Sequence, residues 1–299
     1  MKLKKNKMEI KTILKLIILT VLLNSCEGES ENLFLDEPED ISPVITIPEE
    51  RNLKKGLGVT TGKPYWKTKV KNLNVSWHYS WGNTLPMQEP EGVEFVPMIW
   101  GANRNAVKFQ ENIDRVIALK TSGVAKYLLG FNEPDGIEQS NITVERAIEN
   151  WPKLEALNLP LGSPAPVNTE NEWMTSFMSE AKTNNLRIDF VCMHWYGGLN
   201  VDSFLAKIEK TYELYGKPIW ITEFAPADWN ATSPENSKHT KAEILTFMKE
   251  VLPQLDKLSY VHRYAWYSAK ITSGPLGNAA LYDDQGNLTT LGKYYRDYN

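Results

Sequence analysis

The chain has 299 residues, which is long enough for one α/β barrel or for two smaller domains. It carries 33 basic and 37 acidic residues, and the formal net charge of −4 argues against a nucleic-acid-binding surface. A surface of this charge repels phosphate polymers and tolerates neutral ones.

The amino terminus combines a lysine-rich stretch with an apolar core from Leu16 to Leu23. That core is shorter than the about 20 apolar residues that span a bilayer, and it is typical of a secretory signal over residues 1–25. Leu23-Asn-Ser-Cys26 resembles the lipobox of bacterial lipoproteins, whose cysteine carries the lipid. The alternatives are an ordinary cleaved signal and an unlipidated Cys26. We expect an exported lipoprotein at the outer membrane or cell surface, with Cys192 as a lone thiol in the core.

Residues 26–53 are acidic, contain prolines and lack long apolar periods. Such a segment cannot bury enough apolar surface to order itself, so we predict a disordered tether. The tether would join the anchor to one folded domain over residues 54–299.

Eight strand-like apolar runs follow in chain order and alternate with helical patterns. They are predicted at residues 57–59, 75–79, 95–100, 126–131, 159–162, 188–194, 219–222 and 261–266. Their mean spacing is close to the roughly 30 residues of a βαβ unit. This alternation predicts a parallel sheet of the α/β class, and eight units predict closure into a (β/α)8 TIM barrel.

Apolar residues at helical spacing predict helices around residues 109–117 and 204–212, which end near Gly123 and Gly216. Thr169-Glu-Asn-Glu172 is a capping-box pattern for another helix. Residues 82–92 instead contain two prolines and no helical period. We therefore expect the second helix of the barrel to be missing or irregular.

Two of the predicted strands end in a glutamate. In one, Glu133 precedes Pro134, which lacks an amide donor and biases Glu133 towards an extended backbone, so the strand should end there. In the other, Glu223 follows Ile219-Trp-Ile-Thr222. Each glutamate alone could cap a helix or pair with a lysine. Together they fall after strands four and seven and face each other across the barrel mouth, as cleavage of a glycosidic bond requires.

Three motifs occur in order along the chain: Gly130-Phe-Asn-Glu-Pro-Asp135, His194-Trp-Tyr-Gly197 and Trp220-Ile-Thr-Glu-Phe-Ala225. Together they resemble glycoside hydrolase family 128, within the clan of barrel hydrolases that carry glutamates after strands four and seven. The resemblance covers about residues 54–299 and implies a retaining endo-β-1,3-glucanase. By position it implies that Glu133 is the acid/base, that Glu223 is the nucleophile, and that Asn132 holds the sugar 2-hydroxyl.

The resemblance also implies that Tyr196 hydrogen-bonds the nucleophile and that Trp266 is an aromatic platform after strand eight. His194 is expected to bind a hydroxyl or a backbone group, and an aromatic plug at the barrel top is the alternative for both His194 and Tyr196. Aromatic rings at strand ends offer flat faces to sugars. Further sugar contacts are expected from Trp100 and Trp195, whereas either sugar contact or strand packing is open for Trp77, Tyr79 and Trp81.

The four histidines show no paired ligand spacing, so we expect neither a metal ion nor a cofactor. The expected partner is a β-glucan, cut at internal β-1,3 bonds by double displacement, and the protein is expected to be a monomer that meets the membrane only through its lipid anchor. Three alternatives are a hydrolase of another β-glycan, a glycan-binding lipoprotein on an inactive barrel, and a phosphate-handling barrel. The last lacks a glycine-rich phosphate signature after strands seven and eight.

Overall fold

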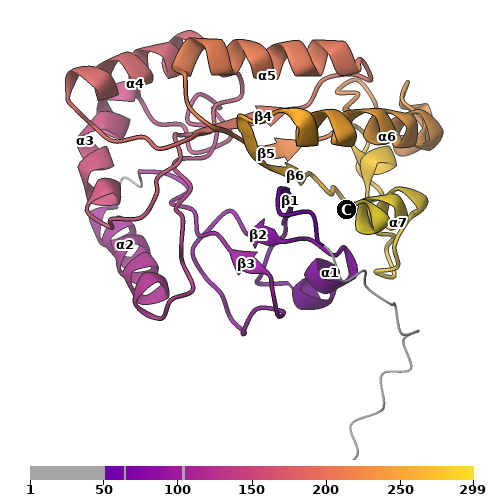
Figure 1. The fold of residues 1–299 in the computed structure, drawn as a ribbon, viewed down its shortest axis with the longest axis horizontal. Helices are drawn as coiled ribbons and strands as arrows, with labels where there is room; N and C mark the ends of the chain where they lie inside the picture. The colour runs from indigo at the N-terminus through magenta and orange to yellow at the C-terminus, as the bar shows by residue number, and fades with distance from the viewer. Residues whose placement is uncertain (1–50, 64, 103–104) are drawn as a thin grey trace, which may run out of the picture. The chain divides into compact units, whose positions relative to one another are not determined.

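The structure is a computed structural model that describes residues 51–63, 65–102 and 105–299 (Figure 1). The predicted signal peptide, Cys26 and nearly all of the predicted tether lie outside the described residues. Within the described ranges, none of the helices has the length and apolar character needed to cross a membrane.

The last three residues assigned to the tether, 51–53, lie against the folded domain. Arg51 donates to the side chain of Asn74 at 3.2 Å, and Asn52 donates to Asp256 at 2.8 Å. The folded domain therefore begins no later than Arg51, three residues before the predicted boundary.

Six parallel strands form one sheet in the order β3-β2-β1-β6-β5-β4. They are β1 (Lys55–Gly58), β2 (Trp77–Tyr79), β3 (Glu94–Phe95), β4 (Val191–Trp195), β5 (Ile219–Phe224) and β6 (Val261–Trp266). β1 pairs with both β2 and β6, so the first and last strands of the chain are neighbours. This pairing is what closure of a barrel requires.

Two further extended segments complete the ring between β3 and β4. Parallel bridges join Met98 to Leu129, Leu128 to Leu161, and Gly162 to Phe190, which directly precedes β4. The two segments are the predicted fourth and fifth strands. They pair only at isolated positions because nearby prolines have no amide to donate to a sheet. The predicted (β/α)8 barrel is thus confirmed.

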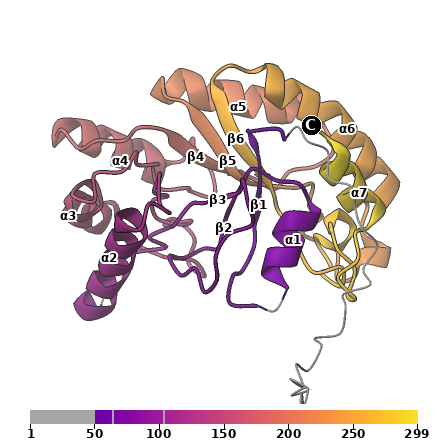
Figure 2. The ribbon, with the colours of Figure 1, turned by 60° about the horizontal axis from the view of Figure 1, so that its bottom comes forward.

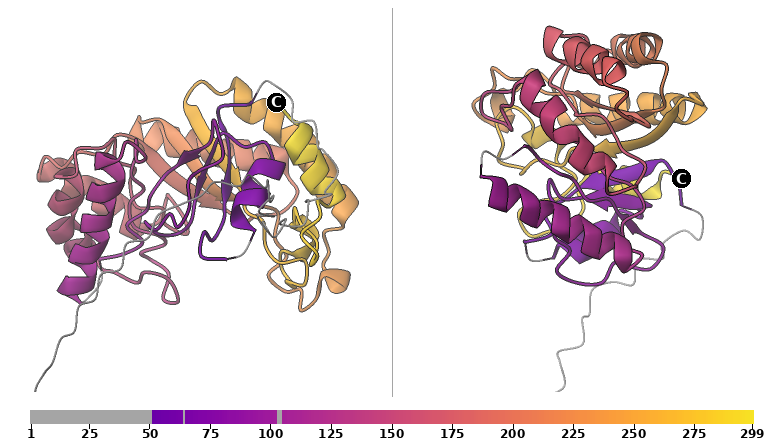
Figure 3. Two further views of the ribbon diagram at one scale, coloured as in Figure 1. Left: turned by 90° about the horizontal axis from the view of Figure 1, so that it is seen from below. Right: turned by 90° about the vertical axis from the view of Figure 1, so that its left-hand side faces the viewer.

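Seven α-helices are present in the described part of the chain and lie around the outside of the strands (Figures 2 and 3). They are α1 (Trp66–Asn72), α2 (Ala106–Thr121), α3 (Val144–Glu155), α4 (Glu172–Thr183), α5 (Val201–Tyr215), α6 (Lys241–Lys257) and α7 (Thr290–Asp297), with short 3-10 turns at Pro234–Asn236 and Gly277–Ala279. The connection from β2 to β3 contains no helix, as predicted from residues 82–92.

The predicted helical faces are mostly correct. α2 buries Phe109 and Ile113, whereas Ile117 at the edge of the stripe is 47% exposed. α5 buries Phe204 and Ile208 and ends at Gly216, whose φ of 59° is the left-handed conformation that glycine favours.

The predicted capping box before α4 is wrong by two residues. The cap is Asn171, whose side chain accepts from the amide of Met174 at 3.0 Å. Thr169 instead shares a hydrogen bond with Thr211 of α5 at 2.7 Å. Its hydroxyl therefore joins the loop before α4 to the neighbouring helix.

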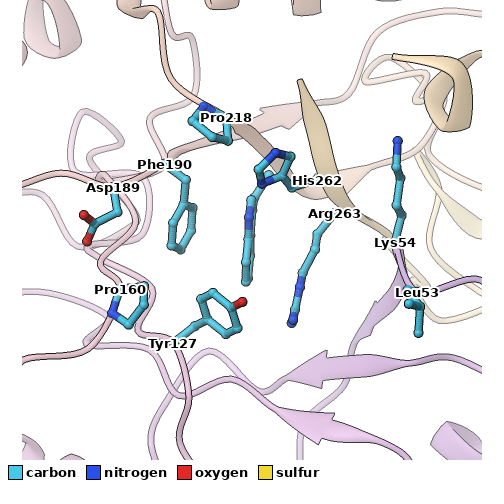
Figure 4. Close-up of a pocket in the computed structure, with 10 residues that line it drawn as sticks. Leu53, Lys54, Tyr127, Pro160, Asp189, Phe190, Pro218, His262 and Arg263 are labelled. Atoms are coloured by element: carbon cyan, nitrogen blue, oxygen red, sulfur yellow. The ribbon is translucent and has the colours of Figure 1, made fainter. Parts of the chain in front are cut away.

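Arg263 fills the amino-terminal end of the barrel. Its guanidinium donates to both oxygens of Glu94 at 3.0 and 3.2 Å and lies 4.3 Å from the ring centre of Trp220. A cavity of about 470 Å³ opens beside it, lined in part by Tyr127 and His262 (Figure 4). Arg263 thus gives this end of the barrel a paired charge among aromatic rings.

Lys55 of β1 is fully buried, and its ammonium donates to backbone carbonyls of Tyr295 at 2.8 Å and Arg296 at 3.2 Å at the end of α7. Burial lowers the pKa of Lys55 to about 7, and the charges of Asp297 and Asp256 offset part of that effect. Lys55 therefore connects β1 to α7 through an amine whose pKa is lowered to about 7.

Replacing Lys55 by Met should change how stability depends on pH. In the unfolded chain Lys55 keeps its proton up to pH about 10.5, so between pH 7 and that value the unfolded state binds more protons than the folded state. The free energy of unfolding of the wild type should therefore rise with pH relative to Lys55→Met. Urea unfolding at pH 6, 7, 8 and 9 measures this difference, and parallel pH curves for the two proteins would contradict it.

Candidate active site

Polar side chains from three strand positions meet at the carboxyl end of the barrel. Glu133 follows the fourth strand position, His194 lies in β4 with Tyr196 just after it, and Glu223 lies near the end of β5. His194 is paired with Glu223 in the β4–β5 register, and the register shifts directly before His194 and again within β5. Such bulges re-aim side chains at strand ends.

The two glutamates predicted as catalytic lie close together. One carboxylate oxygen of Glu133, one of Glu223 and a ring nitrogen of His194 all lie within 4.8 Å of one another. Carboxyl groups about 5–5.5 Å apart are typical of retaining glycosidases, and about 6.5–9.5 Å of inverting ones. The approach of one oxygen from each group to within 4.8 Å is compatible with the shorter of these two separations.

Three donors converge on Glu223. Tyr79 and the indole of Trp81 donate to Oε1 at 3.0 and 2.6 Å, and the hydroxyl of Tyr196 donates to Oε2. The contact predicted for Tyr196 is thus present. Burial and the negative charge of Glu223 raise the pKa of Tyr79 and of Tyr196 well above 10, so both hydroxyls keep their protons and act as donors.

His194 links the two carboxylates. Its Nδ1 is hydrogen-bonded to Oε1 of Glu133 at 3.0 Å, and its Nε2 lies 3.5 Å from Oε1 of Glu223. Burial opposes the charged ring, but the carboxylates of Glu223 and Glu133 outweigh it and raise the pKa of His194 above 6.5. Among the described residues Nδ1 has Glu133 as its partner and Nε2 has no hydrogen-bond partner, so the expected contact of His194 with a hydroxyl or a backbone group stays a prediction. One hydrogen bond, between His194 and Glu133, and the 3.5 Å approach of His194 to Glu223 account for the closeness of the three groups.

Glu133 has a φ of 38°, in the left-handed region that residues other than glycine rarely adopt. The expectation of an extended backbone before Pro134 is wrong here. The amide of Glu133 donates to the carbonyl of Ala165 at 2.7 Å, which ties the turn to the fifth strand position. Its side chain is 14% exposed, against 7% for Glu223. The strained turn therefore presents the more open of the two carboxyl groups.

Asn132 is buried beside this turn. Its amide group donates to Gln139 over a long 3.4 Å, and its Oδ1 has no hydrogen-bond partner among the described residues. A buried acceptor without a partner is costly unless a ligand satisfies it. The position fits the predicted role of Asn132 as a partner for a sugar hydroxyl.

A family model described as glycosyl hydrolase catalytic core matches residues 56–295. Among solved structures, a subgroup I endo-β-1,3-glucanase of glycoside hydrolase family 128 from Amycolatopsis mediterranei, a mutant in complex with laminaripentaose, is 30% identical with a TM-score of 0.70. The match covers 83% of this chain and 100% of that one. The chain belongs to glycoside hydrolase family 128.

Other members of family 128 differ in what their names state. A curdlan-specific exo-β-1,3-glucanase of subgroup III from Blastomyces gilchristii is 30% identical over 82% of this chain and 98% of that chain, with a TM-score of 0.64. A subgroup VII oligosaccharide-binding protein from Trichoderma gamsii is 23% identical over 84% and 94%, with a TM-score of 0.62, and shows the shared fold alone.

A curated relative, alkali-sensitive linkage protein 1 of Schizosaccharomyces pombe, is 28% identical over 256 residues. The match covers 81% of this family 128 chain and 44% of that protein. The chain thus spans less than half of the length of this relative.

Not all aromatic residues predicted to bind sugar are placed to do so in this family 128 barrel. Trp266 is 0% exposed and its indole donates to the carbonyl of Ala279 at 2.9 Å, so the predicted platform is contradicted. Trp195 stacks on Phe204 of α5 because it points outward, one residue from the inward-facing His194 and Tyr196. Both rings therefore pack between strands and helices.

Two further predicted aromatic contacts lie inside the barrel. Trp77 is fully buried and its indole donates to the carbonyl of Lys54 at 3.0 Å, near the amino-terminal end. Packing, the alternative left open for it, is what the structure shows. Tyr79, two residues on, donates to Glu223. Trp100 is 38% exposed after β3 and remains accessible.

Three further aromatic residues lie around the family 128 site. Trp81, for which sugar contact or strand packing was left open, donates to Glu223. The ring of Tyr267 lies 5.4 Å from that of Tyr196, and Trp229 is 64% exposed while its indole donates to the carbonyl of Tyr196 at 3.3 Å. The contact of Trp81 follows the period of two along a strand, because it lies two residues after Tyr79.

Proposed function

We propose that the protein is a retaining endo-β-1,3-glucanase. The observation that carries this proposal is the pair of carboxylate oxygens of Glu133 and Glu223 within 4.8 Å at the carboxyl end of the barrel. Family 128 relatives that are β-1,3-glucanases support the linkage, and the endo-acting ones support cleavage inside the chain.

Two steps account for the reaction. First, the acid of Glu133 protonates the glycosidic oxygen while a carboxylate oxygen of Glu223 attacks the anomeric carbon; the bond to the leaving sugar breaks and a glycosyl ester forms. Then Glu133, now a carboxylate, takes a proton from water, the water oxygen attacks the same carbon, and the ester bond breaks. Tyr79 and Trp81 hold Glu223 throughout, Tyr196 donates to it before the attack, and His194 stays beside Glu133.

Two alternatives remain distinct from this proposal. A glycan-binding role on an inactive barrel is supported by the oligosaccharide-binding neighbour of the same fold, whereas the intact carboxylate pair and the three donors on Glu223 favour catalysis. Hydrolysis of a different β-glycan would need the same pair and differ only in the sugar contacts.

Product analysis on laminarin, curdlan, mixed-linkage glucan and cellulose tests the function. We expect a ladder of β-1,3 oligosaccharides from laminarin at early times, and ¹H NMR should detect the β-anomer of each new end before it mutarotates. Release of single glucose units would exclude endo action, first appearance of the α-anomer would exclude retention, and binding without products would favour the glycan-binding role.

We further propose that the protein is exported and held at the outer membrane or cell surface through a lipid on Cys26. The lysine-rich start, the short apolar core and the lipobox-like motif support this. The change Cys26→Ser should move the protein from the membrane to the soluble fraction, because it removes the thiol that would carry the lipid. Unchanged membrane partition on immunoblots of the two fractions would contradict the anchor.

A further inference from the structure

Trp81 makes the shorter of the two hydrogen bonds to Oε1 of Glu223, at 2.6 Å against 3.0 Å for Tyr79. Its backbone φ of 52° lies in the left-handed region, which a tryptophan adopts only where its surroundings hold it. Its ring packs against Tyr79 at 5.0 Å and edge-on against Tyr267 at 5.9 Å. The indole is thus fixed in a strained position that aims its N–H at the nucleophile.

Gly58 at the end of β1 provides the space for this ring. A Cβ atom at Gly58 would lie 2.8 Å from Cη2 of Trp81 and 3.2 Å from Cε1 of Tyr79, and the first of these distances is too short for real Cβ contacts. By contrast, a Cβ atom at Gly62, in the loop after β1, would meet no atom within 4 Å. The absence of a side chain at Gly58 is therefore required by the two donors to Glu223.

The connection from β2 to β3, which lacks a helix, is anchored just after Trp81. Asn83 accepts from Arg115 at 2.9 Å and donates to Asn112 at 3.2 Å, both on α2. Farther along, both oxygens of Glu89 contact Nε2 of the buried His78, at 2.8 and 2.7 Å. These contacts replace the packing that a crossover helix would give, and they fix the segment that carries Trp81.

We propose that Trp81 is a positioning residue that, with Tyr79, holds Oε1 of Glu223 and so presents Oε2 to the anomeric carbon. This inference rests on the proposed function. Oε1 accepts two hydrogen bonds and lies 3.5 Å from Nε2 of His194, whereas Oε2 accepts from the Tyr196 hydroxyl alone within the described part of the chain. The oxygen that attacks becomes a poor acceptor and must release its donors, so the oxygen with a single donor attacks at lower cost.

In the first step a lone pair of Oε2 forms the bond to the anomeric carbon, the bond from that carbon to the leaving oxygen breaks, and this oxygen takes the proton of Glu133. Oε1 becomes the carbonyl oxygen of the ester and still accepts from Trp81 and Tyr79. Trp81 therefore keeps its contact in both steps, while the Tyr196 hydroxyl must move away in the first.

Indole ¹⁵N–¹H NMR of the full-length protein tests the contact without any need for activity. The Trp81 signal is assigned by its loss in Trp81→Phe, and we expect it far downfield because the N–H donates to a carboxylate. It should move upfield in Glu223→Ala and in Gly58→Ala, and stay in place in the matched control Gly62→Ala. An unchanged chemical shift of the Trp81 signal in Glu223→Ala would overturn the inference, whatever substrate the enzyme hydrolyses.

Kinetics test the consequence for the reaction. Trp81→Phe keeps a flat apolar ring and should lower kcat on laminarin by about 10- to 100-fold, the range for losing one hydrogen bond to a charged group, with KM changed much less. Gly58→Ala should act in the same direction and Gly62→Ala should match the wild type. Wild-type kcat in Trp81→Phe would overturn the positioning role. If the Trp81 signal shifts as expected but the wild-type protein cleaves no β-1,3-glucan, the proposed function is refuted and the Trp81 contact still stands.

Discussion

Replacing Glu223 by Gln should lower kcat on laminarin by about 10⁴-fold or more, as expected when a nucleophile is removed. The side chain keeps its shape, and its amide oxygen can still accept from Tyr79 and Trp81, whose donors face Oε1. The fold and glycan binding should therefore survive. Steady-state kinetics give the loss in kcat, and titration calorimetry with laminarihexaose gives the retained affinity.

Two controls make the Glu223 result specific. The change Glu213→Gln alters an exposed glutamate of α5 that forms an ion pair with Lys210, and it should leave kcat unchanged. In Glu223→Ala, added azide should fill the space of the lost carboxylate and convert an aryl β-glucoside into the α-glucosyl azide. A β-glucosyl azide, or wild-type hydrolysis by Glu223→Gln, would remove Glu223 from the nucleophile role.

The second large effect is expected for Glu133→Ala. Loss of proton donation should lower the rate by about 10²–10⁴-fold on laminarin, whose leaving sugar needs protonation, and much less on an activated aryl glycoside. The comparison of kcat/KM for these two substrates measures the role of Glu133 directly.

The result for Glu133 also depends on its strained turn, so an isosteric variant is the matched control. Glu133→Gln keeps the length of the side chain and can still form a hydrogen bond with His194. It should show the same dependence of rate on the leaving group as Glu133→Ala. Equal losses on both substrates in both variants would show a disrupted site and would argue against general acid catalysis by Glu133.

Much of the fold could be predicted because the spacing of apolar runs along the sequence indicates the order of strands and helices. Apolar runs at intervals of about 30 residues predict the βαβ repeat, and the prolines of residues 82–92 predict the missing helix. The prolines around the fourth and fifth strands act differently: they leave those strands extended and reduce their pairing to isolated bridges. Asn171 caps α4, whereas the hydroxyl of Thr169 is hydrogen-bonded to Thr211 of α5, a contact between distant residues that no local pattern could reveal.

The two carboxylates could be predicted because each ends a strand, whereas their surroundings depend on backbone irregularities. A period of two separates the outward Trp195 from the inward His194 and Tyr196, and applying it strictly would have removed Trp195 from the site. The left-handed backbone of Glu133 and Trp81 has no sequence signal comparable to a glycine. Closure of the barrel then decides that His194 meets Glu133, since their segments lie 61 residues apart.

The position of His194 between two carboxyl groups means that the negative charge of the site changes place around one imidazole ring. In the proposed reaction Glu133 begins as an acid and Glu223 as a carboxylate, and formation of the glycosyl ester leaves Glu223 neutral and Glu133 charged. Nδ1 of His194 is hydrogen-bonded to Glu133, and its Nε2 lies 3.5 Å from Glu223. We therefore expect a carboxylate beside one ring nitrogen of His194 in each half of the reaction, and this negative charge favours a raised pKa of the ring in both.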